Sequence, residues 1–173
     1  MPTPEFVLEL RKKIGHDLLW LNGVTGCVLD DRDRLLLGRR SDTGEWAMVY
    51  GINEPGEQPA DTVVREIREE TGIDAVVTDL VAVTSSSRVI TYANGDNTMY
   101  MDHSFLCALK PGGNAEPYVG DEESLNVGWF ELDDLPEPLA ASTVERLKLF
   151  RRYLDNKRRG DAHALFVADG VQR

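Results

Sequence analysis

Apolar residues recur at helical spacing in three parts of the chain. The first series stops at Gly15 and predicts a helix over residues 3–15. A second helix is expected to begin near Pro59 and to end at Gly72, and a third is expected over about residues 142–159. The side chains expected to face the core are Phe6, Leu10, Ile14, Val63, Ile67, Val144, Leu147, Phe150 and Leu154.

Between these helices, short apolar or alternating runs predict the strands of a sheet. Residues 24–29 and 35–39 are expected to form a hairpin around the polar turn 30–33. The pair Asn94-Gly95 indicates a second tight turn. The other strands are expected at residues 46–49, 76–84, 88–92, 98–109 and 127–132. Strands interleaved with helices predict an α/β (α+β) fold in a single domain over residues 1–173, whose end from residue 160 has no clear period and is expected to be loosely held.

Composition limits the class of protein further. A length of 173 residues with 42% hydrophobic content fits one folded domain. No apolar run approaches the ~18 residues of a membrane helix, and no secretory signal is visible at the amino terminus, so no membrane partner is expected. With only Cys27 and Cys107, a disulfide framework is excluded. We therefore expect a cytoplasmic protein whose cysteines act as small buried hydrophobes.

The net charge of −11 disfavours nucleic acid as a partner, because such binding depends on Lys and Arg neutralising phosphates. The acidity is concentrated in residues 41–145, which hold 21 acidic and 4 basic side chains. Most of these acids are expected to form a solvated surface. A more specific interpretation requires particular acids at particular spacings.

Such a spacing occurs in the second predicted helix. Glu66, Glu69 and Glu70 stand at positions i, i+3 and i+4, so their carboxylates share one face. Like charges near the negative carboxyl end of a helix destabilise it. One interpretation is an ordinary solvated helix face. The other is a site for a hard divalent cation such as Mg²⁺ or Mn²⁺, whose charge offsets the carboxylates.

Residues around this helix extend the same interpretation. Glu57, in the preceding loop, can fold back to the acidic face. Gly51 can offer a backbone carbonyl where a side chain would obstruct the approach. Arg65, four residues before Glu69, is placed to hold a ligand carboxylate in position.

The spacing of these residues matches a known motif. Gly51, five intervening residues, Glu57, seven more, and then the run Arg65-Glu66-Ile67-Arg68-Glu69-Glu70-Thr71-Gly72-Ile73 occupy every fixed position of the Nudix box. The chain therefore resembles the Nudix hydrolases. The resemblance implies an α/β/α sandwich around a mixed β-sheet and hydrolysis of a nucleoside diphosphate linked to another moiety. It further implies a Mg²⁺ or Mn²⁺ cofactor held by Gly51, Glu57, Glu66, Glu69 and Glu70.

The expected reaction is attack of an activated water on a diphosphate linkage. Catalytic roles are expected for Glu66, Glu69 and Glu70, with Glu69 or Glu66 the first choice for the general base. In this family the base can also lie outside the box. The distal candidates are Asp121, Glu122 and Glu123, each of which can equally be part of a solvated acidic loop.

The sequence indicates the residues that contact the substrate less clearly than it indicates the metal ligands. Arg39 and Arg40 end a strand before the box and can either bind phosphate or remain solvated. Tyr50 stands where this family often has a glycine, and it can line the substrate pocket or fill the core. The substrates expected first are ADP-ribose-like compounds and nucleoside triphosphates. A homodimer through the first helix is also open.

Two other functions remain alternatives. The chain can be a binding module that keeps the box and senses a nucleotide, or an isomerase of an isoprenoid diphosphate on the same scaffold. Turnover of an intact ligand in the presence of metal separates the first alternative from a hydrolase.

Overall fold

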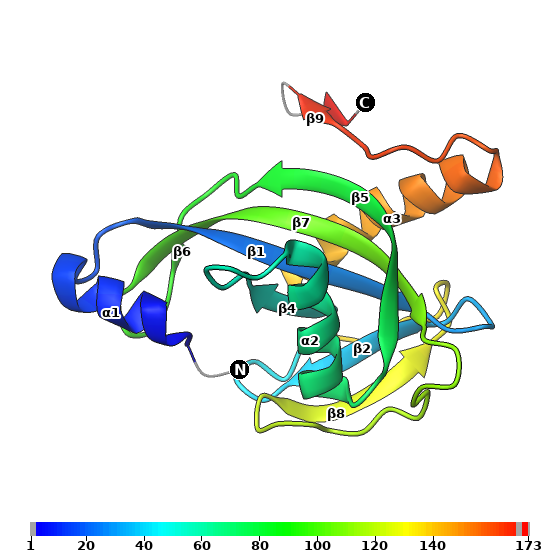
Figure 1. Ribbon diagram of the computed structural model, residues 1–173, viewed down its shortest axis with the longest axis horizontal. Helices are drawn as coiled ribbons and strands as arrows, with labels where there is room; N and C mark the ends of the chain where they lie inside the picture. The colour runs from blue at the N-terminus through cyan, green and yellow to red at the C-terminus, as the bar shows by residue number, and fades with distance from the viewer. Residues whose placement is uncertain (1–2, 169–170, 173) are drawn as a thin grey trace.

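A mixed β-sheet lies at the centre of the molecule, and a helix covers each of its faces (Figure 1). The computed structural model describes residues 3–168 and 171–172. Helix α2 (Pro59–Thr71) packs on one face through Val63 and Ile67. Helix α3 (Ala141–Arg158) packs on the other face, in a separate cluster of buried side chains. The expected α/β/α sandwich is confirmed.

The strands follow the order β3-β2-β1-β7-β5, with β4 paired to β1, β6 to β7 and β8 to β2. Their bounds are β1 Leu19–Leu29, β2 Leu35–Arg40, β3 Trp46–Ala47, β4 Val49–Ile52, β5 Ala75–Ser85, β6 Ile90–Thr91, β7 Asn97–Leu109 and β8 Ser124–Phe130. Strands β1 and β7 run parallel from Leu19 opposite Thr98 to Leu29 opposite Ala108. The other pairs in this sheet are antiparallel. The sheet is therefore mixed, as expected.

The first predicted hairpin is only partly correct. Strands β1 and β2 are consecutive, but their pairing in the described structure is limited to Leu29 opposite Leu35. Strand β2 instead pairs with β8, and β4 pairs with β1 at Gly23–Gly26. The second hairpin is confirmed, since β6 pairs with β7 and places Ile90 opposite Thr98.

One predicted core residue of the last helix is wrong. Leu147, Phe150 and Leu154 are buried, but Val144 is 41% exposed. Thr143 is buried in its place. Its hydroxyl oxygen accepts a hydrogen bond from the Met48 amide at 3.1 Å, so the first turn of α3 faces the sheet with a polar side chain.

Helix α1 (Glu5–Ile14) also differs from its predicted packing. The helix ends before Gly15, which has a φ of 58°, as expected for a stop signal. Its buried side chain is Val7, whereas Leu10 is 36% exposed. Arg11 ties the helix to the start of β7 by donating hydrogen bonds to the backbone carbonyl of Asn97 and the hydroxyl of Thr98. Polar contacts therefore hold this helix where an apolar face was expected.

The chain after residue 160 is not uniformly loose. Leu165 is 2% exposed within the α3-side core, and its amide donates to the Val81 carbonyl at 2.7 Å. Two short strands follow, β9 (Val167–Ala168) and β10 (Val171–Gln172). The expectation of a loose tail is therefore wrong at Leu165, where one apolar side chain anchors the segment beside β5.

Both cysteines are free and buried, as expected, and they lie in different apolar clusters on opposite faces of the sheet. Burial raises the pKa of the Cys107 thiol to about 12 and that of Cys27 further, so both stay protonated. Within residues 3–168 and 171–172, no helix combines the length and the apolar character needed to cross a bilayer.

Candidate active site

The carboxylate of Glu66 lies directly against the backbone of Gly51. Glu66 is fully buried, and a Cβ atom at Gly51 would lie 2.3 Å from its Cγ and 2.4 Å from its Oε1. Among the described residues neither carboxylate oxygen has a hydrogen-bond partner, although the guanidinium of Arg65 is 3.2 Å from Oε1. Burial raises the pKa of Glu66 to about 7, against the opposing charge of Arg65. Gly51 thus makes room for a desolvated carboxylate.

Arg65 lies among three of the predicted metal ligands. Its Nε and Nη2 donate to the two oxygens of Glu57 at 2.9 and 3.0 Å, and its Nη1 donates to Glu69 at 3.0 Å. The hydrogen bonds from Arg65 lower the pKa of Glu57 to about 2. Arg65 therefore holds the carboxylates of Glu57 and Glu69 in place.

Glu70 lies on the other side of the acidic face. Burial raises its pKa to about 8, and the charges of Glu66 and Asp121 add to this effect. The positive charge of Arg40 acts in the opposite direction and lowers the pKa of Glu70. The guanidinium of Arg40 also forms a bidentate pair with Asp42 at 2.9 and 2.7 Å. A bound cation would relieve the same conflict among the carboxylates.

The loop before β8 brings Asp121 to this site. The amides of Tyr118 and Gly120 donate to the carbonyls of Thr71 and Glu70 at 3.0 and 3.1 Å. Within the predicted distal set, Asp121 is the residue whose charge acts on Glu70. The other two members differ in position: Glu122 is exposed, and the carbonyl of Glu123 accepts from the Ser41 amide at 2.7 Å.

Replacing Gly120 by Ala should displace this loop. The new Cβ would lie 1.9 Å from the carbonyl oxygen of Glu69, which belongs to the helix backbone and cannot move aside. We expect destabilisation by about 2 kcal/mol or more, measured by urea unfolding. Glu122→Ala, a change at an exposed position of the same loop, should leave stability within about 0.5 kcal/mol. A Gly120→Ala variant as stable as the parent would show that the loop does not pack on α2 as described.

The predicted substrate-contacting residues separate into two groups. Arg39 and Arg40 are adjacent at the end of β2, where the pairing with β8 shifts register, and their side chains have different surroundings. Arg40 is brought near Glu70 and Tyr50, whose charges raise its pKa after the larger effect of Asp42. Arg39 is exposed and donates to the Gly44 carbonyl at 3.0 Å.

A polar network on the α3 side was missed by the sequence interpretation. Asp102 of β7 is 5% exposed and accepts hydrogen bonds from Thr25, Ser104 and Arg146. Arg146 also lies over the ring of Tyr50. The available signal was a carboxylate in the middle of a strand otherwise rich in apolar and hydroxyl side chains.

The carboxylate oxygens of the box are ligands of the type that a divalent cation prefers. They are not gathered into a complete metal site. Among the described residues, no group of three or more His, Cys, Asp or Glu side chains lies close enough together to hold a metal. Glu57 and Glu69 are directed onto Arg65 instead. Within the part of the chain that the structure describes, Glu66 nevertheless provides two buried oxygens without hydrogen-bond partners beside a glycine, which is the kind of site that a hard cation fits.

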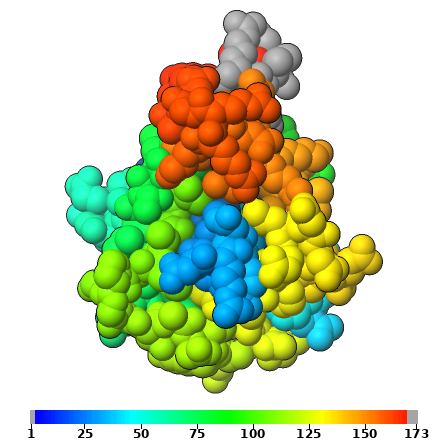
Figure 2. All heavy atoms as spheres, turned by 90° about the vertical axis from the view of Figure 1, so that its right-hand side faces the viewer, coloured from blue at the N-terminus to red at the C-terminus, as the bar shows by residue number. Residues whose placement is uncertain are grey.

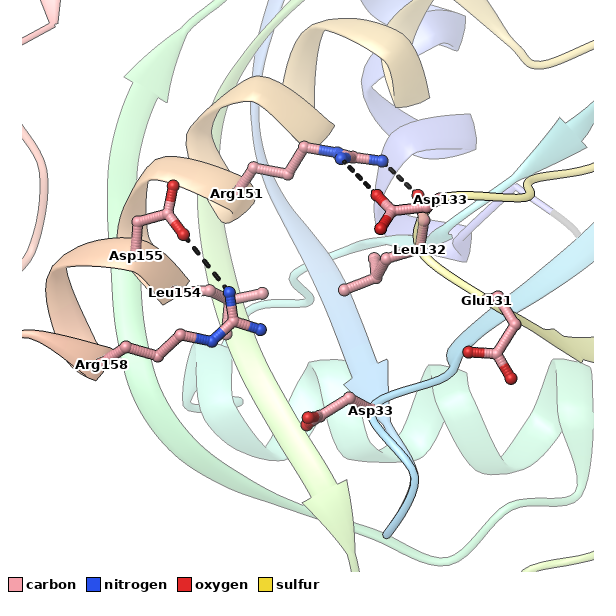
Figure 3. Close-up of a pocket in the computed structure, with 8 residues that line it drawn as sticks. All are labelled: Asp33, Glu131, Leu132, Asp133, Arg151, Leu154, Asp155 and Arg158. Atoms are coloured by element: carbon pink, nitrogen blue, oxygen red, sulfur yellow. Dashed lines mark hydrogen bonds and ion pairs between the residues drawn. The ribbon is translucent and has the colours of Figure 1, made fainter.

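Two surface hollows of the described structure lie away from the box. One, of about 400 Å³, is lined by the end of α3 and the segment after β8 (Figure 3). Its guanidinium groups are already paired, Arg151 with Asp133 at 3.2 Å and Arg158 with Asp155 at 3.3 Å. The other, of about 600 Å³, is lined by the β1–β2 turn, which Figure 2 shows in blue, and by residues 115–117. Neither hollow is lined by a residue of the box.

The sandwich fold, with the acidic helix face beside Gly51, defines a site of the Nudix type. The NUDIX domain family model matches residues 20–153, and the chain belongs to the Nudix hydrolase family. It is 32% identical over 136 residues to human nucleoside diphosphate-linked moiety X motif 6. A MutT-like protein of Streptomyces ambofaciens is 33% identical over 124 residues, which cover 72% of each chain.

Solved structures agree with this assignment. A MutT NUDIX hydrolase from Burkholderia pseudomallei is 28% identical with a TM-score of 0.59, and the match covers 76% of this chain and 98% of that one. A UDP-X diphosphatase is 26% identical with a TM-score of 0.62, covering 90% and 71%. The match to the human relative covers 74% of this chain but 41% of that protein, so the chain spans less than half of its length.

Proposed function

We propose that this protein is a metal-dependent pyrophosphohydrolase that cleaves a diphosphate linkage in a nucleoside diphosphate derivative. The observation that carries the proposal is the buried carboxylate of Glu66, without a hydrogen-bond partner among the described residues and seated against Gly51. A charged group in such a place is costly unless positive charge compensates it. The box spacing and the membership of the family support the same conclusion.

Glu66 and Glu70 would hold Mg²⁺ or Mn²⁺, with Glu57, Glu69 and the Gly51 carbonyl completing the set. When bound, the cation supplies positive charge that binds phosphate oxygens and eases deprotonation of the attacking water. Arg65 keeps Glu57 and Glu69 oriented through its hydrogen bonds at 2.9–3.0 Å. Glu69 has a half-exposed side chain, which suits it to accept the proton of the water.

Asp121 is the alternative base. It lies close enough to Glu70 to raise that residue's pKa, and its loop is fixed to the end of α2 by backbone hydrogen bonds. A base in this position would approach the water from the Asp121 side of Glu70, whereas Glu69 would approach it from the Arg65 side. We place Glu69 first because Arg65 fixes its carboxylate at 3.0 Å.

The substrate class is a nucleotide derivative with a phosphoanhydride bond. Relatives include a mouse protein named 8-oxo-dGDP phosphatase, 28% identical over 83% of this chain and 41% of that protein, and the UDP-X diphosphatase structure. Both names describe hydrolysis of nucleoside diphosphates or their derivatives. We therefore place ADP-ribose, UDP-sugars and nucleoside triphosphates first, acted on by a protein that works in the cytoplasm.

The function is tested by incubating the purified protein with each of these compounds in Mg²⁺ or Mn²⁺. We expect release of a nucleoside monophosphate from at least one compound, detected by mass spectrometry, and no release in EDTA. The absence of turnover across the panel contradicts the proposal. Tight calorimetric binding of an intact nucleotide without turnover would instead support a sensing module.

A further inference from the structure

A fixed charge pair lies next to the box on the α3 side of the sheet. The carboxylate of Asp102 accepts hydrogen bonds at 2.7 Å from both Thr25 and Ser104. Arg146 donates to the same carboxylate from Nη2 at 3.0 Å and from Nε at 3.4 Å. With four donors on a buried carboxylate, the guanidinium of Arg146 is held in one orientation.

Arg146 also covers the ring of Tyr50, with its Cζ 4.7 Å from the ring centroid. The hydroxyl of Tyr50 is hydrogen-bonded to Thr143 at 2.5 Å and to Ser142 at 3.2 Å, both in the first turn of α3. The ring and the guanidinium therefore form a rigid stack. Neither Tyr50 nor Arg146 is one of the predicted metal ligands.

The stack lies beside the predicted site of phosphate chemistry. Tyr50 directly precedes Gly51 in β4, and successive side chains of a strand face opposite sides. Tyr50 therefore faces α3 while Gly51 faces Glu66 of α2. Arg40 lies within electrostatic reach of both Tyr50 and Glu70. A substrate whose phosphates lie at the carboxylates would extend past β4 to the stack.

The chemistry of Arg146 indicates what it would contact. Asp102 already occupies the Nε and Nη2 edge of the guanidinium and offsets its charge, which leaves little attraction for a further phosphate. Tyr50 covers one face of the group, yet 24% of the side chain remains exposed. A planar, charge-neutralised guanidinium is well suited to stack on an aromatic ring.

A glycine lies in the sheet beside Asp102, where other groups approach the backbone closely. Gly23 of β1 lies opposite Asp102 of β7. A Cβ at this position would lie 3.3 Å from the ring of Tyr100 and 3.8 Å from the Asp102 carboxylate. A glycine inside a strand is typical of places where another group approaches the backbone closely.

We propose that Arg146 and Tyr50 form the subsite for the nucleobase of the substrate, with Asp102 as the positioning residue that presents the guanidinium. The proposal rests on the nucleotide substrate class proposed above. It assigns base recognition to a surface that shares no side chain with the acidic helix face. Binding of the base can therefore be measured without turnover.

The test compares AMP with ribose 5-phosphate, which lacks the base, by calorimetry in EDTA. Wild-type protein should bind AMP about tenfold more tightly than ribose 5-phosphate, as expected for one stacked base. Arg146→Lys keeps a positive charge beside Asp102 but lacks the plane. We expect this variant to lose most of the AMP preference while binding ribose 5-phosphate as before. On a nucleotide substrate, KM should rise about tenfold with kcat changed less than about threefold.

The matched control is Arg151→Lys, at a position further along the same helix where the partner Asp133 lies 3.2 Å away. This variant should keep the AMP preference and the kinetics of the wild type.

Tyr50→Leu, which removes the stacked ring, is a second variant for the case in which Arg146→Lys folds poorly. It should also lose the preference for AMP. The proposal is overturned if wild-type protein does not distinguish AMP from ribose 5-phosphate, or if the variants keep the preference. Because the calorimetric comparison of AMP with ribose 5-phosphate needs neither metal nor turnover, it separates this proposal from failure of the hydrolase assignment.

Discussion

Replacing Glu69 by Gln is expected to lower kcat by about 10²–10⁴-fold, the usual loss when a general base is removed. The amide has nearly the shape of the carboxylate and keeps an acceptor for Arg65, which lies 3.0 Å away, so the fold should be retained. Glu70→Gln should cause a comparable loss, because Glu70 is a proposed ligand. Steady-state kinetics at saturating Mg²⁺, with circular dichroism to check folding, measure both effects.

The control is Asp61→Asn, which removes a carboxylate from an exposed position of the same helix and should change kcat less than about twofold. Near-normal turnover in both the Glu69 and Glu70 variants would refute their roles. Asp121→Asn distinguishes the two proposed bases. If this change lowers kcat more than Glu69→Gln does, the base lies in the loop before β8.

The elements that could be predicted from sequence are those whose signals are local. Helix α2 extends from Pro59 to Thr71, close to its predicted bounds, because a proline start and a glycine stop act within the segment itself. The acidic face follows directly from helical geometry once the helix is placed. Residue spacing within one element was therefore sufficient to place Glu66, Glu69 and Glu70 on one face of the helix, although in the described part of the chain their carboxylates are not close enough together to hold a metal.

The parts that could not be predicted depend on distant pairing. The hairpin of β1 and β2 was inferred from proximity in sequence, yet the long partner of β1 is β7, with Val24 opposite His103. Likewise, Arg146 contacts Asp102 from 44 residues away, and neither residue carries a local signal for the other. The position of Asp121 beside Glu70 depends on Gly120 packing against α2, a fit that is visible only in three dimensions.

The second large effect is expected at Gly51, where a substitution changes the site without removing any proposed side-chain ligand. In Gly51→Ala the new methyl group would lie 2.3–2.4 Å from the Cγ, Cδ and Oε1 atoms of Glu66, so that side chain must leave its place. Glu66 is fully buried beside Val63 and Ile67, and it has little other space to occupy. We expect kcat to fall by at least about 10²-fold, since the displaced carboxylate could no longer help to hold the proposed cation.

A readout independent of turnover is the effect of Mn²⁺ on thermal stability. At about ten times its dissociation constant, a ligand specific for the folded state stabilises it by about 1.4 kcal/mol, which should raise the Tm of wild-type protein by about 3 °C or more. The Gly51→Ala variant should show no rise in Tm on addition of Mn²⁺, provided that it is folded and gives a measurable unfolding transition. Gly128→Ala, in β8, places a methyl group 3.3 Å from the Phe130 ring and away from the box, and it should keep the Mn²⁺ effect. A Gly51→Ala protein that Mn²⁺ stabilises as strongly as wild type would show that cation binding does not depend on Glu66 occupying the space beside Gly51.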